Sequence, residues 1–223
     1  MADERHSDGG SDDDPATDDA ASDTPTSHRS GEPDAFGSPY RLLSTAVTPR
    51  PIAWVSTLAA DGTPNLAPHS YFNLVAHDPP HVVLGSAGRK DTLRNIEATG
   101  EFVVNLTTEH VLKQMNASAI DAPPQVDEFE LVGVTPTPAT VVAPPRVAEA
   151  LGHLECRVAH LLELGSGHLV VGEVVHVHVD RRVWRDGRVA PELLRPVLRL
   201  AGSQYGTLGE LFKLERPSWD APT

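Results

Sequence analysis

The strongest constraint on the fold of this chain is a pair of alternating apolar segments in residues 153–179, separated by the turn Gly165-Ser166-Gly167. Apolar side chains recur at every second position, the period at which the side chains of a β-strand return to one face. The expected buried face comprises Leu154, Cys156, Val158, Leu162 and Leu164, then Leu169, Val171, Val175, Val177 and Val179. The pattern predicts a long antiparallel hairpin with one buried face. Glu173 shares the apolar spacing, which predicts either a β-bulge at Gly172 or a buried carboxylate with a partner.

From Pro39 onward the chain contains further short β-type segments separated by turn residues. The dipeptide Asp61-Gly62 favours a hairpin turn. Pro68 lies in the returning segment and cannot donate a hydrogen bond to a neighbouring strand, so this segment must lie at a sheet edge or break there. A broken strand leaves backbone amides free to bind something else. The expected strands are residues 52–58, 65–73, 81–85 and 102–106.

Two segments have a helical pattern, residues 91–98 and residues 109–118. Asp91 is the expected N-cap of the first helix, and Gly100 is its expected end. Many short strands, hairpin turns and few helices predict a mainly β fold, an antiparallel barrel with a few capping α-helices.

The charge is concentrated at the N-terminus, where residues 1–37 hold eleven acidic residues and two arginines. This segment has almost no large apolar side chain before Phe36, so burial cannot offset the entropy of ordering it. We expect a disordered acidic tail over residues 1–37 and one folded domain over residues 38–220.

Composition also narrows the expected partners and location. No basic stripe is present, which argues against a nucleic-acid partner. No run of eighteen apolar residues is present, so we expect no membrane partner. The single cysteine, Cys156, cannot form an intrachain disulfide and predicts a cytoplasmic location, and its place in an alternating segment favours a small core residue over a nucleophile.

The segment most informative about chemistry is residues 85–92, Gly-Ser-Ala-Gly-Arg-Lys-Asp-Thr. It places small residues, two cations and a hydroxyl at the start of a helix, where free amides and the helix dipole favour an anion. The pattern indicates a phosphate site. The alternative is a capped helix with two solvated bases.

Several motifs together closely resemble the flavin reductase-like FMN-binding family, in its flavoredoxin branch. The motifs are residues 49–57 (PRPIAWVST), 65–73 (NLAPHSYFN), 78–80 (DPP), 90–96 (KDTLRNI), 101–106 (EFVVNL), 154–156 (LEC), 172–174 (GEV) and 199–205 (RLAGSQY). They occur in the expected order and span about residues 40–217.

The resemblance implies a split barrel that binds FMN non-covalently near the interface of a homodimer. Motif matches imply that Ser56, Thr57, Arg89, Lys90 and Thr92 hold the phosphate, with Asp91 in the same motif. The segment Ser70, Tyr71, Phe72 and Asn73 would run along the isoalloxazine ring. Asn65 would bond either the flavin or the turn. Hydroxyls and cations suit a dianion, and free amides suit the polar edge of the ring.

Other residues have two interpretations each. Trp54 could pack near the flavin, although a strand tryptophan is more often core. His168 matches a position where related reductases carry a histidine near the nicotinamide, or it is an exposed turn residue. His176 and His178 share a strand face, but no third metal ligand is evident, so we expect solvent-facing histidines and no metal site. Residues 199–205 either reach the partner's flavin or pack as a C-terminal strand on their own subunit.

We expect a flavin-dependent oxidoreductase that takes electrons from NADH, NADPH or another reduced donor and passes them to a small molecule through FMN. No catalytic side chain is identified, since the flavin would supply the chemistry. The alternatives are an FMN electron carrier with a protein donor and a non-catalytic flavin-binding module. No Gly-x-Gly-x-x-Gly motif is present, so a nicotinamide would have to stack on the flavin without a Rossmann site.

Overall fold

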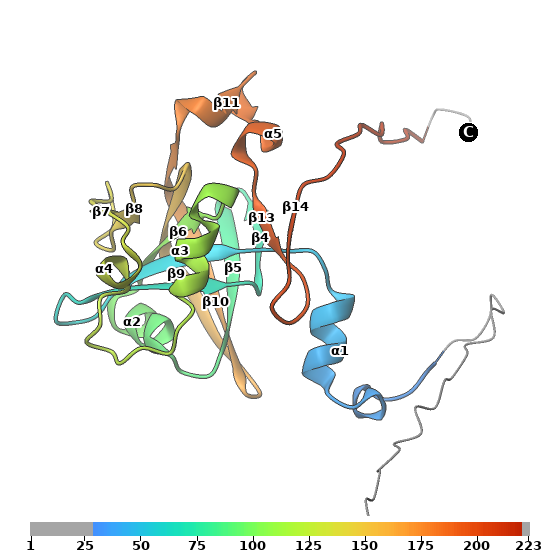
Figure 1. Cartoon of the computed structure of the whole chain (residues 1–223), viewed down its shortest axis with the longest axis horizontal. Coiled ribbons are helices and arrows are strands. Elements are labelled where there is room, and N and C mark those ends of the chain that lie inside the picture. The colour runs from blue at the N-terminus through green and yellow to red at the C-terminus, as the bar shows by residue number, and fades with distance from the viewer. Residues whose placement is uncertain (1–28, 220–223) are drawn as a thin grey trace, which may run out of the picture.

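A computed structural model describes residues 29–219 of the chain, and its centre is a seven-stranded antiparallel sheet (Figure 1). The strand order is β3-β2-β6-β9-β10-β5-β4, so β3 and β4 are the two edges. The strands are β2 (Ala53–Leu58), β3 (Pro64–His69), β4 (Phe72–His77), β5 (Pro80–Ala87), β6 (Glu101–Leu106), β9 (Gly152–Leu164) and β10 (Gly167–Val179). The expectation of a mainly β, antiparallel fold is confirmed.

The long hairpin is present as β9 and β10, but its expected buried face is correct only in part. Two β-bulges interrupt the pairing: Ala159 is unpaired on β9 between two register positions, and Val175 is unpaired on β10. Each bulge exchanges the faces beyond it. Before the bulge at Val175, the core face of β10 is formed by Val170, Gly172 and Val174, and the odd-numbered residues expected there lie on the opposite face.

The tip of the hairpin extends beyond the core, so Leu162 and Leu164 are exposed, as is Val177 on β10. Neither interpretation of Glu173 is correct as stated: the unpaired residue next to Gly172 is Ala159 of β9, and Glu173 is partly buried opposite the exposed Arg157. Gly172 itself is required by close packing, because a Cβ there would lie 2.4 Å from the Phe102 ring.

The expected strand over residues 65–73 is split between the two edges of the sheet. β3 continues through Pro68, which pairs with Trp54 of β2 and lies at the sheet edge as expected. The chain then leaves the strand at Ser70 and Tyr71 before β4 begins at Phe72.

The helices partly match expectation. α2 (Asp91–Thr99) ends at Gly100 in the left-handed conformation, but Lys90 and not Asp91 occupies the N-cap, without a side-chain cap. The expected helix over residues 109–118 is present as η2 (Glu109–Val111) and α3 (Leu112–Ala117). The sequence pattern missed α1 (Pro39–Ala46) and α4 (Glu128–Val132).

Two cores stabilise the sheet. One packs Trp54 and Leu66 against α3 and α4, and Trp54 is fully buried with its indole N–H donating to Ser118. The other packs Leu93 and Ile96 of α2 against the inner strands. The core interpretation of Trp54 is therefore confirmed.

The remaining elements are short. β1 (Arg50–Pro51), β13 (Val197–Arg199) and β14 (Tyr205–Thr207) form a small sheet, in which Arg199 and Tyr205 pair with each other within the chain. The others are η1 (Pro33–Phe36), β7 (Pro136–Thr137), β8 (Arg146–Val147), η3 (Arg181–Val183), β11 (Trp184–Arg185), β12 (Arg188–Val189) and α5 (Pro191–Leu194).

Much of the expected acidic tail, residues 1–28, lies outside the described residues, and so does residue 220 at the expected domain end. Residues 29–37 are described and include η1. Within residues 29–219 no helix is long and apolar enough to cross a membrane.

Candidate functional site

Beneath the start of α2, polar side chains from two strands and the helix form a buried cluster. The Asn65 amide donates to the hydroxyls of Thr57 at 3.2 Å and Thr92 at 3.1 Å, and the Asn95 amide donates to Thr57 at 3.1 Å. All four side chains are buried. The structure thus brings together Thr57, Asn65 and Thr92 of the expected site, and adds Asn95.

Ser56 does not join this cluster, because successive strand residues point to opposite faces. Its hydroxyl donates to the Pro145 carbonyl at 2.5 Å and accepts from the Asn105 amide at 3.2 Å. The side chain is fully buried there. Its placement therefore offers no surface to a phosphate, in contrast to the expectation for Ser56.

The charged residues at the start of α2 lie on the surface. Arg89 pairs with Glu97, Asp91 pairs with Arg94, and Lys90 lies 3.2 Å from Asp121. The Arg89 and Lys90 side chains are 62% and 61% exposed, and such ion pairs are weak in water. Both cations are therefore free to exchange an acidic partner for an anion.

His69 and Glu128, which the sequence pattern missed, border a small cavity with Asn65, Lys90 and Thr92. The His69 ring lies 3.3 Å from the Thr92 hydroxyl. Burial lowers the pKa of His69 to about 4, helped by the Lys90 charge. Burial raises the pKa of Glu128, whose carboxylate accepts a hydrogen bond from Leu66 N–H.

A larger groove of about 740 Å³ opens where the chain leaves β3 and enters β4. Its lining is mostly apolar, and its volume lies within the usual range of small-molecule sites. All four residues expected along the ring border it, namely Ser70, Tyr71, Phe72 and Asn73. The opposite walls come from α1, β5 and the hairpin tip.

Backbone amides at the strand break lack partners. Among residues 29–219, no acceptor takes a hydrogen bond from the backbone N–H of Ser70 or Tyr71. Gly85 allows Tyr71 to pack closely against β5, since a Cβ at this position would lie 2.9 Å from the Tyr71 Cβ. The groove therefore combines apolar walls with free donors, the composition expected of a site for a planar ring with a polar edge.

Two side chains at the groove have buried nitrogen atoms without partners in the described part of the chain. They are Nδ1 of His168, on the hairpin tip, and Nε of Arg50. His168 is thus a partly buried groove residue and not an exposed turn residue. Arg50 lies in one of the family motifs, although the sequence suggested no role for it. Its guanidinium also donates to the carbonyls of Ser44, Val47 and Leu200.

The polar cavity and the groove are joined by a short piece of chain. Pro68 borders the cavity at α2, and Ser70 borders the groove. Two residues of extended chain span roughly 7 Å. A ligand with a phosphate, a flexible linker and a planar ring could occupy both regions, so the residues present fit FMN.

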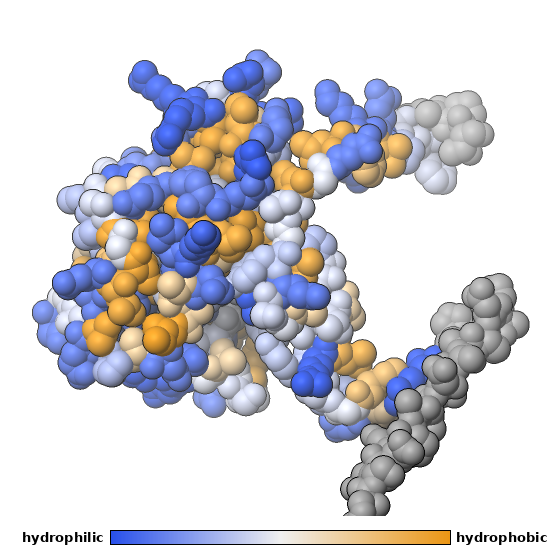
Figure 2. Space-filling view, in the orientation of Figure 1, coloured by the Kyte–Doolittle hydropathy of each residue, from blue (hydrophilic) through white to orange (hydrophobic). Residues whose placement is uncertain are grey.

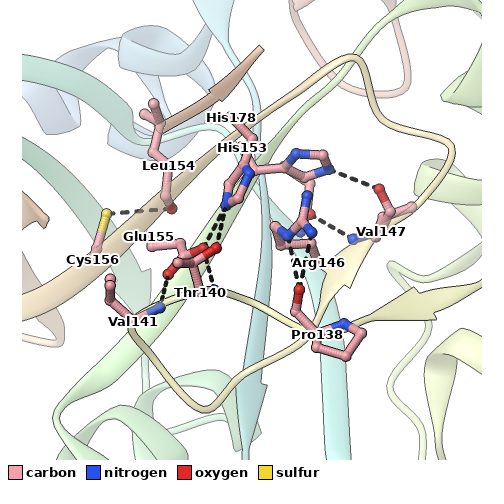
Figure 3. A network of polar contacts seen from close by, with 11 residues as sticks. Pro138, Thr140, Val141, Arg146, Val147, His153, Leu154, Glu155, Cys156 and His178 are labelled. Atoms are coloured by element: carbon pink, nitrogen blue, oxygen red, sulfur yellow. Dashed lines mark hydrogen bonds and ion pairs between the residues drawn. The ribbon is translucent and has the colours of Figure 1, made fainter. Parts of the chain in front are cut away.

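A second group of ionisable residues lies at the other end of the hairpin (Figure 3). The fully buried Glu155 carboxylate accepts from Thr140 N–H and Val141 N–H, each at 2.7 Å, and from His178 at 2.6 Å. Burial would raise the pKa of Glu155, yet these hydrogen bonds lower it to about 2. Burial also raises the pKa of Cys156, so this thiol is a core residue and no nucleophile.

Residues 45–196 match the family model for the flavin reductase like domain. Nitrilotriacetate monooxygenase component B from Bacillus cereus has a TM-score of 0.82 and 37% identity, over 85% of this chain and 100% of that chain.

Two further likenesses concern proteins whose names mention flavin chemistry. The flavoredoxin of Desulfovibrio vulgaris (Miyazaki F) has a TM-score of 0.70 and 24% identity, over 75% of this chain and 91% of that chain. A flavin reductase (NADH) of Kitasatospora aureofaciens is 34% identical over 144 residues, 64% of this chain and 70% of that protein. The solved structures confirm the expected split-barrel fold and its likeness to flavoredoxins.

Proposed function

Because this chain belongs to the flavin reductase like domain family, we propose that it is an oxidoreductase that binds FMN non-covalently and transfers electrons through it from NADH or NADPH. The observation that carries the proposal is the groove at the break between β3 and β4, with its apolar walls and unpaired amides. Bound FMN would supply reversible hydride and electron transfer. The protein would supply binding, orientation and a fixed electrostatic environment.

The ring end of the flavin is assigned to the groove. The N–H groups of Ser70 and Tyr71 would donate to the polar edge of the ring, where negative charge develops on reduction. Phe72 and the apolar walls would exclude water from the ring. Nδ1 of His168, which has no partner among the residues described, supports a role for this side chain beside the ring or a bound nicotinamide.

The phosphate end is assigned to the start of α2. Arg89 and Lys90 would exchange their weak surface partners for the dianion, and Thr92 and the first amides of α2 would donate hydrogen bonds. The buried amides of Asn65 and Asn95 hold the Thr57 and Thr92 hydroxyls in place. On this assignment Thr57 and Asn65 position the site from beneath, and Asp91 fixes Arg94 by an ion pair.

NADH or NADPH is the proposed donor on two grounds. A relative is named a flavin reductase (NADH), and the groove, at about 740 Å³, is an open site into which a nicotinamide could enter beside the flavin. In the absence of a Rossmann motif, the nicotinamide would be held by stacking, which accepts either cofactor. The single free cysteine, Cys156, suits the reducing cytoplasm we propose as its location.

The decisive experiment is a visible spectrum of the purified protein, followed by NADH and NADPH oxidation with and without added FMN. We expect flavin absorption and oxidation of at least one nicotinamide that depends on FMN. Flavin absorption with reduction only by a protein donor would identify an electron carrier. Flavin absorption without reduction by any donor would identify a binding module, and absence of flavin binding would overturn the proposal.

We also propose that the protein acts as a homodimer. Apolar side chains stay exposed next to the groove on α1, and the C-terminal segment extends away from the body with apolar side chains along it (Figures 1 and 2). These residues are Tyr40, Leu43, Val47, Phe212, Leu214 and Trp219. A two-fold interface would cover such surface and close the groove.

Sedimentation of the flavin-loaded protein at decreasing concentration tests the dimer. If the second subunit completes the site, FMN and subunits should dissociate together on dilution. A flavin-loaded monomer would contradict this.

A further inference from the structure

We propose that Glu155, His176 and His178 form a binding site for a divalent transition metal ion of the zinc type, separate from the flavin groove. One carboxylate oxygen and one nitrogen from each ring lie within 4.8 Å of one another. Two imidazoles and a carboxylate are a ligand set that zinc takes in proteins, with water at the open position. The sequence pattern alone lacked the third ligand, and the fold supplies it from β9.

The β-bulge at Val175 creates this arrangement. Val174 pairs with Cys156, so a regular strand would place Val175 opposite Glu155 and both histidines on the opposite face. Because Val175 is unpaired, His176 is opposite Glu155 and His178 is opposite His153. The rings of His176 and His178 then lie on the same face of the sheet as the carboxylate, and their centroids are 4.7 Å apart. Bulges commonly redirect side chains in this way.

The present distances need only small side-chain rotations to accept an ion. Tetrahedral zinc at 2.0–2.1 Å from its ligands holds them about 3.3 Å apart. The Glu155–His178 contact of 2.6 Å would lengthen by less than about 1 Å. His176 would approach, and it has no hydrogen bond to lose among residues 29–219.

The negative charge of the buried Glu155 carboxylate also favours the binding of a cation. Within residues 29–219 no lysine or arginine forms an ion pair with this fully buried carboxylate, and its only ionisable partner is His178. A buried carboxylate is stable when it is paired or bound to a metal. The two N–H donors of residues 140 and 141 would stay in place and orient the carboxylate, as outer hydrogen bonds do in metal sites.

The site is open to solvent and distant from the groove. The His178 side chain is 22% exposed, and His176 is also partly exposed. His168, at the groove, is eight residues from His176 along β10, which corresponds to roughly 25 Å. Zinc and flavin binding should therefore be independent.

Zinc titration of the untagged protein, after removal of metals by a chelator, tests the proposal. Calorimetry with ZnCl₂ should show one ion bound per chain, and CoCl₂ should give the visible absorption of a four-coordinate ion. MgCl₂, which prefers oxygen ligands, should give neither signal.

The test variant is His176→Gln, which removes one ligand and leaves the Glu155–His178 contact intact. The matched control is His160→Gln, an exposed histidine on neighbouring β9. His176→Gln should weaken zinc at least tenfold, since even outer residues of metal sites change affinity by 10- to 100-fold, and should leave flavin content unchanged. Equal zinc affinity in His176→Gln and wild type, a comparable loss in His160→Gln, or no zinc binding by wild type would each overturn the proposal.

Discussion

The Glu155 carboxylate at the base of the β9–β10 hairpin and the polar groups beside the hairpin tip contrast in how they are satisfied. At the base, the Glu155 carboxylate is fully buried and accepts three hydrogen bonds from the same chain. At the tip, His168 has a buried nitrogen without a partner in the described part of the chain, and Leu162 and Leu164 are exposed. The groove beside the tip also has two backbone amides, those of Ser70 and Tyr71, that donate to no acceptor within residues 29–219.

The Glu155 carboxylate is thus satisfied within the chain without a flavin or a second subunit, although Nδ1 of nearby His153 is buried without a partner among residues 29–219. Groups that are satisfied within the chain contribute to folding, whereas unpaired groups in an open groove are available to a ligand or a second subunit. Substitutions at the base should therefore reduce stability and spare flavin binding. Substitutions around the groove and the start of α2 should do the reverse.

The largest expected effect is at the base. Glu155→Gln would place an amide N–H₂ against backbone donors and remove the charge that His178 contacts, so we expect a loss of about 3 kcal/mol in the free energy of unfolding. Urea unfolding in the presence of a chelator measures this. The control is Glu163→Gln, an exposed carboxylate on the same strand, which should change stability by less than about 0.5 kcal/mol. Similar losses in both variants would remove the contrast between base and tip.

The next effect concerns flavin binding without a change in stability. Replacing Arg89 and Lys90 together by alanine should weaken FMN by about 3 kcal/mol, because a hydrogen bond to a charged group contributes about 1.5–3 kcal/mol. Riboflavin, which lacks the phosphate, should bind as before, and the urea midpoint should not move. Equal losses for FMN and riboflavin would show that these bases do not contact the phosphate.

The sequence predicted most strands because strand signals are local, whereas most residues of the candidate site were expected from the resemblance to the flavin reductase-like family. Alternation, turn dipeptides and the motif around α2 depend only on neighbouring residues. Even α1 and α4, which the pattern missed, have local signals of a helix. Ser38 is the N-cap of α1 and is followed by a proline, and α4 begins after the N-cap Asp127 and ends at Gly133.

What the sequence could not predict depends on long-range contacts and on bulges. A single unpaired residue, Val175, changes which face His176 and His178 occupy, and alternation alone does not reveal it. The partners of Glu155 come from the loop at residues 140 and 141 and from His178, 23 positions away. Ser56 lay in the expected motif, but its contact with Pro145, 89 positions away, determines its surroundings.

A third prediction concerns the small cavity at the start of α2, where His69 should make the stability of the protein depend on pH. The folded-state pKa of His69 is about 4, below the ordinary value of about 6.5. Between these values the unfolded chain binds a proton that the folded chain does not, so stability should fall as pH decreases from 6.5 to 4.

His69→Gln should remove part of this decrease in the free energy of unfolding. We expect its share to be about 2 kcal/mol between pH 7 and pH 4, because partial exposure of the ring reduces the effect of burial. His153, whose pKa burial also lowers to about 4, acts in the same direction and accounts for a further part. Urea unfolding at several pH values measures the slope, with the exposed His77→Gln as control. An unchanged slope in His69→Gln would show that His69 is not the group responsible.

The smallest effect is expected from removing the acidic N-terminus. A chain that begins at Phe36 should fold with an unchanged urea midpoint, because residues 29–35 are exposed. Their contacts with the remaining chain are weak surface ones, the Arg29 guanidinium over the Phe36 ring and the hydrogen bond from Gly37 N–H to the Asp34 carbonyl. FMN affinity at low salt should rise slightly, since residues 1–35 contain eleven acidic residues and two arginines and would repel a phosphate dianion. At about 0.15 M salt the Debye length is about 8 Å, so this gain should disappear. Titration of FMN at two ionic strengths measures both effects, and loss of flavin or of stability in the shortened chain would show that the N-terminus completes the groove.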